Sequence, residues 1–167
     1  TYRDSLRGDE SGGNNDARPI NKKTGQADSS ALGPDQFIDE TWMKFAQDED
    51  WAQGLSREDI LKRRTDPVIS EKILQEFTAD NGRIMSKELD RKPTAEELRL
   101  AHFSGPHGAV QVLQADNSAK IDTVLTDAKK AKDPSHTNFR LFYSGVDQEG
   151  KPIPRTVGEY MKQFGVK

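Results

Sequence analysis

Apolar residues recur at helical spacing along most of the chain. Four of them between Ile69 and Ile84 fall on one helical face, after Asp66-Pro67, where a capping acid precedes a proline at the first helical position. The apolar residues of 121–128 and of 157–164 follow the i, i+3, i+4, i+7 spacing of an amphipathic helix. This pattern predicts a mainly α protein, with the segment after Asp66 as its central buried helix.

Capping residues mark where several helices begin. Ser56 precedes an acidic turn, and the pairs Thr94 with Glu97 and Thr156 with Glu159 have the spacing of a capping box. In such a box each side chain accepts a hydrogen bond from a backbone N–H that the first helical turn leaves free. We therefore expect helices to begin directly after these three residues.

Two stretches are rich in residues that favour turns. Residues 11–35 and 144–155 are dense in Gly, Pro and Asn or Asp, which leaves room only for loops and a short hairpin. We find no internal repeat and no linker. The sequence thus predicts one domain over residues 1–167, mainly α, with a small β-hairpin or irregular patch near the N-terminus.

Composition sharpens this picture. Leu, Ile, Val and Phe together make up about 20% of the chain, which is near the level typical of disordered proteins, but the net charge is only −3. The absence of Cys excludes disulfides, and three His residues offer little for a metal, so we expect no metal and no cofactor. An isoelectric point near 5.7 argues against nucleic-acid binding, and the lack of a long apolar run argues against membrane insertion.

Three short motifs carry candidate chemistry. The first is Glu10-Ser11-Gly12-Gly13-Asn14, after a short helical segment; the second combines Ser30-Ala31-Leu32-Gly33 with Gln36-Phe37; the third runs from Ala101-His102-Phe103-Ser104-Gly105 to Gly108. In this order they resemble the motifs of the lysozyme-like soluble lytic transglycosylases, relatives of goose-type lysozyme. The chain differs from the family's motifs at two places. It has Pro34-Asp35 where many relatives have Leu-Met, and His102-Phe103 where the family usually has Tyr-Asn.

The resemblance implies a lysozyme-like fold and an activity on peptidoglycan glycan strands. It assigns Glu10 as the catalytic acid, Gln36 as a substrate contact, and Ser11 and Ser30 as lesser contacts. The pattern is closest to members associated with secretion systems or phage particles, so such an assembly is a further expected partner. Because the wall lies outside the cytoplasm, we expect a periplasmic or extracytoplasmic monomer whose targeting segment is absent from this chain.

Glycosidic cleavage needs a proton for the leaving oxygen and stabilisation of a cationic sugar. A neutral Glu10 would supply the proton if apolar neighbours such as Phe37 and Phe103 raised its pKa. Asp28, 18 positions after Glu10, is the candidate for a second carboxylate, and Asp35 is a weaker one. Asp28 equally fits an ordinary turn residue, so both interpretations stay open.

Other candidate substrate contacts come from the third motif and from one turn-rich segment. Phe103 and Gly105 belong to the motif, and His102 either bonds the glycan, steadies Glu10 or lies in the core. Tyr143 is the aromatic residue expected to stack on a sugar, whereas Trp42 and Trp51 are expected to fill the core.

These observations favour a muramidase that hydrolyses the β-1,4 bond between N-acetylmuramic acid and N-acetylglucosamine. A lytic transglycosylase, which needs Glu10 alone and leaves a 1,6-anhydro sugar, is the first alternative. A catalytically inactive wall-binding scaffold is the second. The third is a helical adaptor, which predicts that Val157, Tyr160 and Phe164 are exposed.

Overall fold

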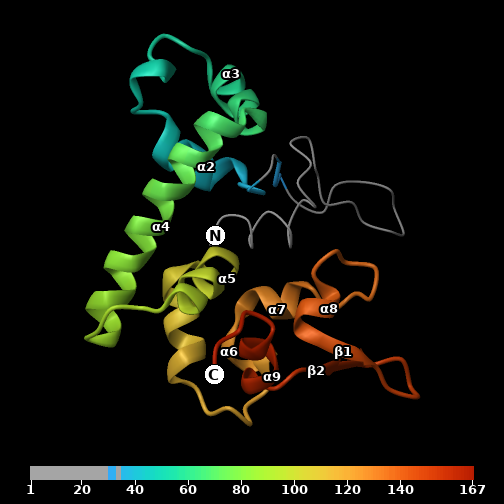
Figure 1. The fold of residues 1–167 in the computed structure, drawn as a ribbon. Helices are drawn as coiled ribbons and strands as arrows, with labels where there is room; N and C mark the ends of the chain where they lie inside the picture. Colours follow the sequence, from blue (N-terminus) through green and yellow to red (C-terminus); the bar gives the residue numbers. More distant parts are fainter. Residues whose placement is uncertain (1–29, 33–34) are drawn as a thin grey trace. The chain divides into compact units, whose positions relative to one another are not determined.

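Helices dominate the protein, as the spacing of its apolar residues predicts. The computed structural model describes residues 30–32 and 35–167, and in this part the chain forms eight α-helices and one small antiparallel sheet (Figure 1). The mainly α class is confirmed. In chain order the α-helices are α2 (Asp39–Ala46), α3 (Arg57–Lys62), α4 (Pro67–Leu89), α5 (Ala95–Gln114), α6 (Ile121–Val124), α7 (Thr126–Lys130), α8 (Phe139–Phe142) and α9 (Val157–Lys162).

The expected helix starts form with the expected caps. The Oγ atom of Ser56 accepts the Asp59 N–H at 3.1 Å, and both capping boxes are complete at the starts of α5 and α9. At the start of α4, Asp66 Oδ1 accepts the backbone N–H of Val68 at 2.9 Å. These bonds satisfy backbone donors that the first helical turn cannot satisfy itself.

The chain divides into two compact units. Unit 1 contains the described residues up to Ala79, and unit 2 contains Asp80–Lys167. Two compact units can belong to one domain, so the single domain over residues 1–167 stays a prediction.

Aromatic side chains hold unit 1 together. Phe37, just before α2, packs against Trp42 of α2 and Phe77 of α4, with ring centroids 5.6 Å apart in each case. Trp42 has no exposed surface, and its Nε1 donates to the carbonyl of Ile60 in α3 at 2.9 Å. Of the four apolar residues predicted to share one face of α4, Ile73 is buried, whereas Ile69, Phe77 and Ile84 are only partly buried. Two short 3-10 helices, Asp50–Ala52 and Arg63–Thr65, complete this unit.

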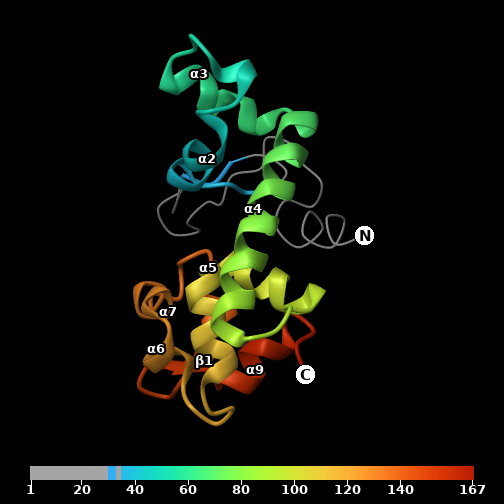
Figure 2. The ribbon, with the colours of Figure 1, turned by 90° about the vertical axis from the view of Figure 1, so that its left-hand side faces the viewer.

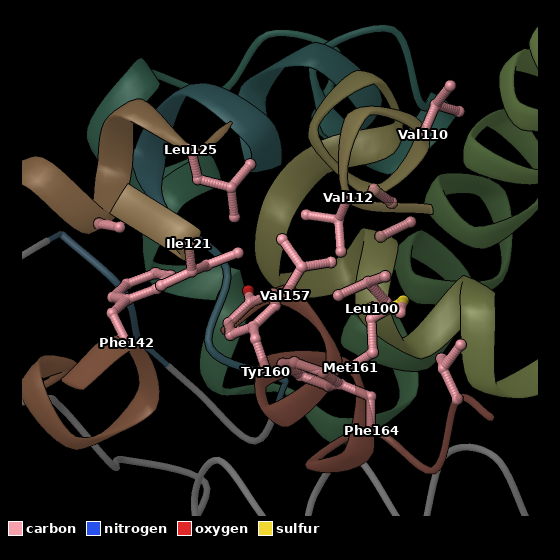
Figure 3. Packing of buried hydrophobic residues seen from close by; sticks show 14 of the residues in the cluster. Leu100, Val110, Val112, Ile121, Leu125, Phe142, Val157, Tyr160, Met161 and Phe164 are labelled. Atoms are coloured by element: carbon pink, nitrogen blue, oxygen red, sulfur yellow. The ribbon is translucent and has the colours of Figure 1, made fainter. Parts of the chain in front are cut away.

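The core of unit 2 brings α5 together with the C-terminal elements. Figure 3 shows side chains of α5, among them Leu100 and Val112, meeting Tyr160 and Phe164 from the end of the chain. Helix α5 lies beside α6 and α9, as two views of the fold show (Figures 1 and 2). Deeply buried aromatic rings supply much of this core, because the chain has few aliphatic residues.

The C-terminal helix belongs to this core. Val157 and Tyr160 have no exposed surface and Phe164 is 3% exposed. The helical adaptor that would present these three residues to a partner is therefore wrong.

The described sheet lies in the second turn-rich stretch. Strands β1 (Tyr143–Val146) and β2 (Pro152–Pro154) pair antiparallel, with Val146 opposite Pro152. Asp147 Oδ1 stabilises the turn between them by accepting the N–H groups of Glu149 and Lys151, each at 2.9 Å. The hairpin or irregular patch predicted near the N-terminus falls mostly on residues 11–29, which lie outside the described residues.

The predicted helix over residues 121–128 is interrupted. It forms as α6 and α7, and Leu125 between them is extended with φ −107° and ψ 125°. The apolar spacing is nevertheless used, because Ile121, Leu125 and Ala128 are all buried. Helix α6 begins in a contact with the end of the chain, where Ile121 N–H donates to the carbonyl of Arg155 at 2.9 Å.

Candidate functional site

The first motif and the candidate second acid stay predictions. Glu10, Ser11 and Asp28 lie outside the described residues. The geometry of the site is therefore built from the second motif in unit 1 and the third motif in unit 2, each taken by itself.

The second motif folds back on itself just before α2. Leu32 and Phe37 form an isolated antiparallel bridge, in which Leu32 N–H donates to the Phe37 carbonyl at 3.2 Å. Ser30 Oγ accepts the N–H of Asp39, the first residue of α2, at 3.0 Å. The segment 30–37, which we call the motif-2 loop, thus brings Ser30, Gln36 and Phe37 of the predicted site together.

Gln36 has an unusual backbone conformation. Its φ is +50°, and among the described non-glycine residues only Asp90 shares a positive φ, at +54°. Asp90 directly follows α4, where a left-handed residue is a common way to end a helix. Gln36 ends no helix, so its strained conformation belongs to the motif-2 loop itself.

Both neighbours of Gln36 are fixed by buried contacts. The Asp35 side chain has no exposed surface, and its Oδ2 accepts the hydroxyl of Ser70 in α4 at 2.7 Å. Phe37 is 3% exposed and packs into the aromatic cluster of unit 1. Gln36 itself is partly exposed between these two anchors. The loop therefore holds the partly exposed Gln36 between two immobilised residues.

Arg64 joins the two ends of this loop. Its side chain is 6% exposed, and Nη1 donates to the carbonyls of Ser30 at 2.6 Å and Phe37 at 2.9 Å. Its Nε donates to the Leu61 carbonyl at 3.0 Å, and Asp39 Oδ1 lies 2.7 Å from Nη1. The buried guanidinium is thus compensated by three backbone carbonyls and one carboxylate.

Sequence reasoning missed both Arg64 and Ser70 as parts of this site. Arg64 ends the run Lys62-Arg63-Arg64, whose composition is that of a solvated surface, and Lys62 and Arg63 are in fact exposed. No feature of the sequence separates the buried Arg from its neighbours. Its position after a short helix, facing a loop 27 residues earlier, follows only from the fold.

The third motif breaks helix α5. Gly105 has φ +69° and ψ 162° inside the helix, and Pro106 follows it. A positive φ with an extended ψ is open essentially to glycine alone, so Gly105 can end the first half of α5 here. The proline at the next position begins the second half, because its fixed φ suits a first helical residue. The motif residue Gly105 is therefore needed for its backbone conformation, and no other atom lies within 4 Å of a Cβ placed there.

His102 and Phe103 both lie on the first half of α5 and are partly buried. The rings contact each other edge to face, with centroids 5.7 Å apart. Phe103 also packs against Phe164, at a centroid distance of 5.1 Å. Phe103 thus gives part of its surface to the core of unit 2.

A small cavity lies beside the third motif. Its volume is about 170 Å³, below the ~300–1,000 Å³ of pockets that enclose a whole drug-sized ligand. Aromatic and aliphatic groups form one part of its wall and hydroxyl, amide and carboxylate groups the rest. The lining residues are Phe103, Ser104, Gly108, Gln111, Leu125, Thr126, Asp127 and Phe142. A cavity of this size and lining suits one ring or substituent of a larger polar ligand.

Two tyrosines of unit 2 are structural. Tyr143 is 1% exposed, stacks on Phe139 and donates its hydroxyl to the Ala128 carbonyl at 2.8 Å, so its ring fills the core where the sequence predicts an exposed sugar platform. Burial raises the pKa of Tyr160 to about 12, and its hydroxyl lies 2.8 Å from Ser104 Oγ. A phenol with that pKa stays neutral near neutral pH and serves here as a hydrogen-bonding group.

The structure brings the remaining predicted contacts together in two groups. Ser30, Gln36 and Phe37 share the motif-2 loop of unit 1, and His102, Phe103 and Gly105 share helix α5 of unit 2. Within the part of the chain that the structure describes, no cluster of three or more His, Asp or Glu residues is arranged to hold a metal ion. No helix among these residues is both long and apolar enough to cross a membrane. Comparison with protein-family models finds none that matches this chain.

Proposed function

We propose that this protein is a muramidase that cleaves the β-1,4 bond between N-acetylmuramic acid and N-acetylglucosamine in peptidoglycan, with Glu10 as general acid. The observation that carries the proposal is the motif-2 loop, in which Gln36 is held at positive φ between two buried neighbours. Strained backbone of this kind clusters at ligand-binding sites, where it fixes a side chain before the ligand arrives. Gln36 is also the residue that the resemblance assigns as a substrate contact.

The third motif supports the same proposal from unit 2. Gly105 breaks α5 beside a cavity that combines Phe103 with polar groups. A sugar presents apolar C–H faces edged by hydroxyl groups, so aromatic surface next to hydrogen-bonding side chains suits it. The limited volume suits one sugar ring or an N-acetyl group of a bound strand, with the rest of the strand outside.

The assignment of acids is part of the proposal. Glu10 donates a proton to the leaving oxygen, and Asp28 either attacks the sugar or positions a water molecule. Asp35 is the weaker candidate, because its carboxylate has no exposed surface and accepts a hydrogen bond from Ser70. A protein of this kind acts on glycan strands in the periplasm or elsewhere outside the cytoplasm, alone or attached to a secretion apparatus or phage particle.

The test is clearing of purified cell-wall sacculi by the wild-type chain and by Glu10→Gln. Removal of a general acid is expected to lower the rate by about 10²- to 10⁴-fold. Glu40→Gln is the matched control, because the Glu40 side chain is 86% exposed on α2 and its substitution is expected to leave the rate unchanged. Equal clearing by wild type and Glu10→Gln would contradict Glu10 as the general acid. No clearing by either protein would contradict the enzyme and favour a wall-binding scaffold.

Product chemistry separates the two enzymatic alternatives. Hydrolysis leaves a reducing end that carries one added water, whereas transglycosylation leaves a 1,6-anhydro sugar without added water. Mass spectrometry of the soluble fragments distinguishes them. The proposal expects reducing ends from the wild type and a large loss of them in Asp28→Asn; anhydro products from the wild type would establish transglycosylation by Glu10 alone.

A further inference from the structure

A buried arginine outside the three motifs contacts both ends of the second one. Arg64 donates from one nitrogen to the carbonyls of Ser30 and Phe37, which lie at the two ends of the motif-2 loop. Closing a loop at both ends removes most of the conformations open to the residues within it. The loop that carries Gln36 is thereby tied to a single side chain from the segment between α3 and α4.

The chemistry of this contact requires arginine. Nε and Nη1 point in different directions from one rigid plane, so a single side chain reaches Leu61 in the preceding helix α3 and the two ends of the loop. A lysine carries the same charge on one nitrogen and cannot reproduce this spread of donors. Burying a guanidinium is also an inefficient way to gain stability, because its desolvation offsets much of the attraction. What Arg64 contributes is a fixed geometry.

Asp35 and Ser70 complete the arrangement on the other side of Gln36. The Ser70 hydroxyl holds the carboxylate of the preceding residue at 2.7 Å, while Arg64 holds the carbonyl of the following residue at 2.9 Å. Rotation of Gln36 out of its positive φ would require one of these buried contacts to break. The strain at Gln36 therefore persists because its surroundings hold it.

We propose that Arg64 is a positioning residue that, together with the Asp35–Ser70 contact, holds Gln36 in the conformation from which it contacts the glycan. This inference rests on the proposed function, since it assigns a role in that reaction. Arg64 itself is too deeply buried to touch a glycan, so it acts through Gln36.

The decisive variant is Arg64→Lys, which keeps the charge and loses the planar arrangement of donors. Misplacement of a contacting group by about 1 Å can cost about 100-fold in rate, and we expect a loss of that order in kcat/KM on solubilised glycan strands. Arg57→Met is the matched control, because Arg57 lies in the same unit with its side chain 54% exposed in a surface pair with Glu40. Its rate is expected to equal that of the wild type.

A double-substitution cycle separates positioning from general loss of stability. Gln36→Gly removes the side chain through which Arg64 acts, so Arg64→Lys in that background is expected to change kcat/KM by less than about 3-fold. Rates are measured well below the Tm of the weakest variant. Hydrogen exchange of the peptide covering residues 30–39 supplies a readout besides activity, and it is expected to speed up in Arg64→Lys but not in Arg57→Met.

The outcomes divide cleanly between the two proposals. The positioning role is overturned if Arg64→Lys keeps the wild-type kcat/KM, or if it lowers kcat/KM equally with and without the Gln36 side chain. The muramidase is still supported in either case if the wild type cleaves glycan and Glu10→Gln does not. Absence of cleavage by the wild type overturns the muramidase. Unchanged hydrogen exchange over residues 30–39 in Arg64→Lys overturns the positioning role whatever the enzyme does.

Discussion

Replacing Gln36 by glycine tests the strain at this position. A side chain held in the left-handed region costs about 1–2 kcal/mol, a cost that glycine does not incur because it has no Cβ. Glycine also lowers the stability of the folded chain by about 0.5–1 kcal/mol, because it gives the unfolded chain more conformational freedom. The balance of the two effects is about 0 to 1.5 kcal/mol in favour of glycine, so the free energy of unfolding of Gln36→Gly is expected to equal that of the wild type or to exceed it by up to about 1.5 kcal/mol. Gln36→Val, which is β-branched, is expected to be at least about 1 kcal/mol less stable.

Urea unfolding measures this difference. Tryptophan fluorescence reports on Gln36, because both Trp residues lie in the same unit, and far-UV circular dichroism reports on Asp90, which lies in unit 2. Asp90→Gly is the control. Asp90 has a φ of +54°, and its replacement by glycine relieves a similar but smaller strain, since Asp tolerates the left-handed region better than Gln does. Gln36→Gly should lose glycan cleavage and Asp90→Gly should keep it. The argument that the backbone of Gln36 is strained would be refuted if Gln36→Gly lowered the free energy of unfolding by more than about 1 kcal/mol, or if Gln36→Val kept the wild-type free energy of unfolding.

Three substitutions in unit 2 test its packing and pH dependence through urea unfolding. Tyr160→Phe removes the hydroxyl 2.8 Å from Ser104 Oγ but keeps the buried ring, and is expected to cost about 1 kcal/mol. Gly105→Ala adds a Cβ at φ +69° and is expected to cost about 1–2 kcal/mol through backbone strain alone. Glu97→Ala is expected to cost about 1–2 kcal/mol near neutral pH, because Glu97 completes a capping box and pairs with Arg91. Hydrogen bonds from Arg91 lower the pKa of Glu97 in the folded chain, so its stabilisation is complete above the ordinary value of 4.5 and is lost as the pH falls through the lowered value. The difference in free energy of unfolding between Glu97→Ala and wild type should therefore shrink as the pH falls further and further below 4.5. An equal difference at neutral and at acidic pH would contradict the ion pair.

The helix starts were predictable from sequence because they depend on neighbours three residues apart. Thr94 and Thr156 each find their Glu partner within one turn, whatever the rest of the fold does. Pro67 likewise begins α4 because its own ring fixes φ. Apolar spacing also predicted which side of α9 would be buried, though not that the helix would fill the core of its own unit instead of binding a partner.

Features that depend on distant contacts were not predictable. Leu125 keeps its place in the helical apolar spacing while its backbone becomes extended, because α6 is also tied to Arg155 near the end of the chain. Tyr143 stands among turn-forming residues, yet it is the first residue of β1 and stacks on Phe139. The burial of Arg64 depends on a loop that lies 27 residues earlier, and no local pattern reports that distance.

The anchoring of the motif-2 loop also bears on which carboxylate the proposed muramidase would use. A carboxylate that attacks the sugar or positions water must face the substrate with a free oxygen, at about 5–9.5 Å from the acid. Asp35 has no exposed surface, and one of its carboxylate oxygens accepts a hydrogen bond from Ser70. The Asp35 carboxylate is therefore not free to face a substrate as a second acid. Positioning and catalysis are competing uses of this one side chain. Under the proposed hydrolysis, Asp35 is therefore a poor second carboxylate, and Asp28 stays the candidate for that role.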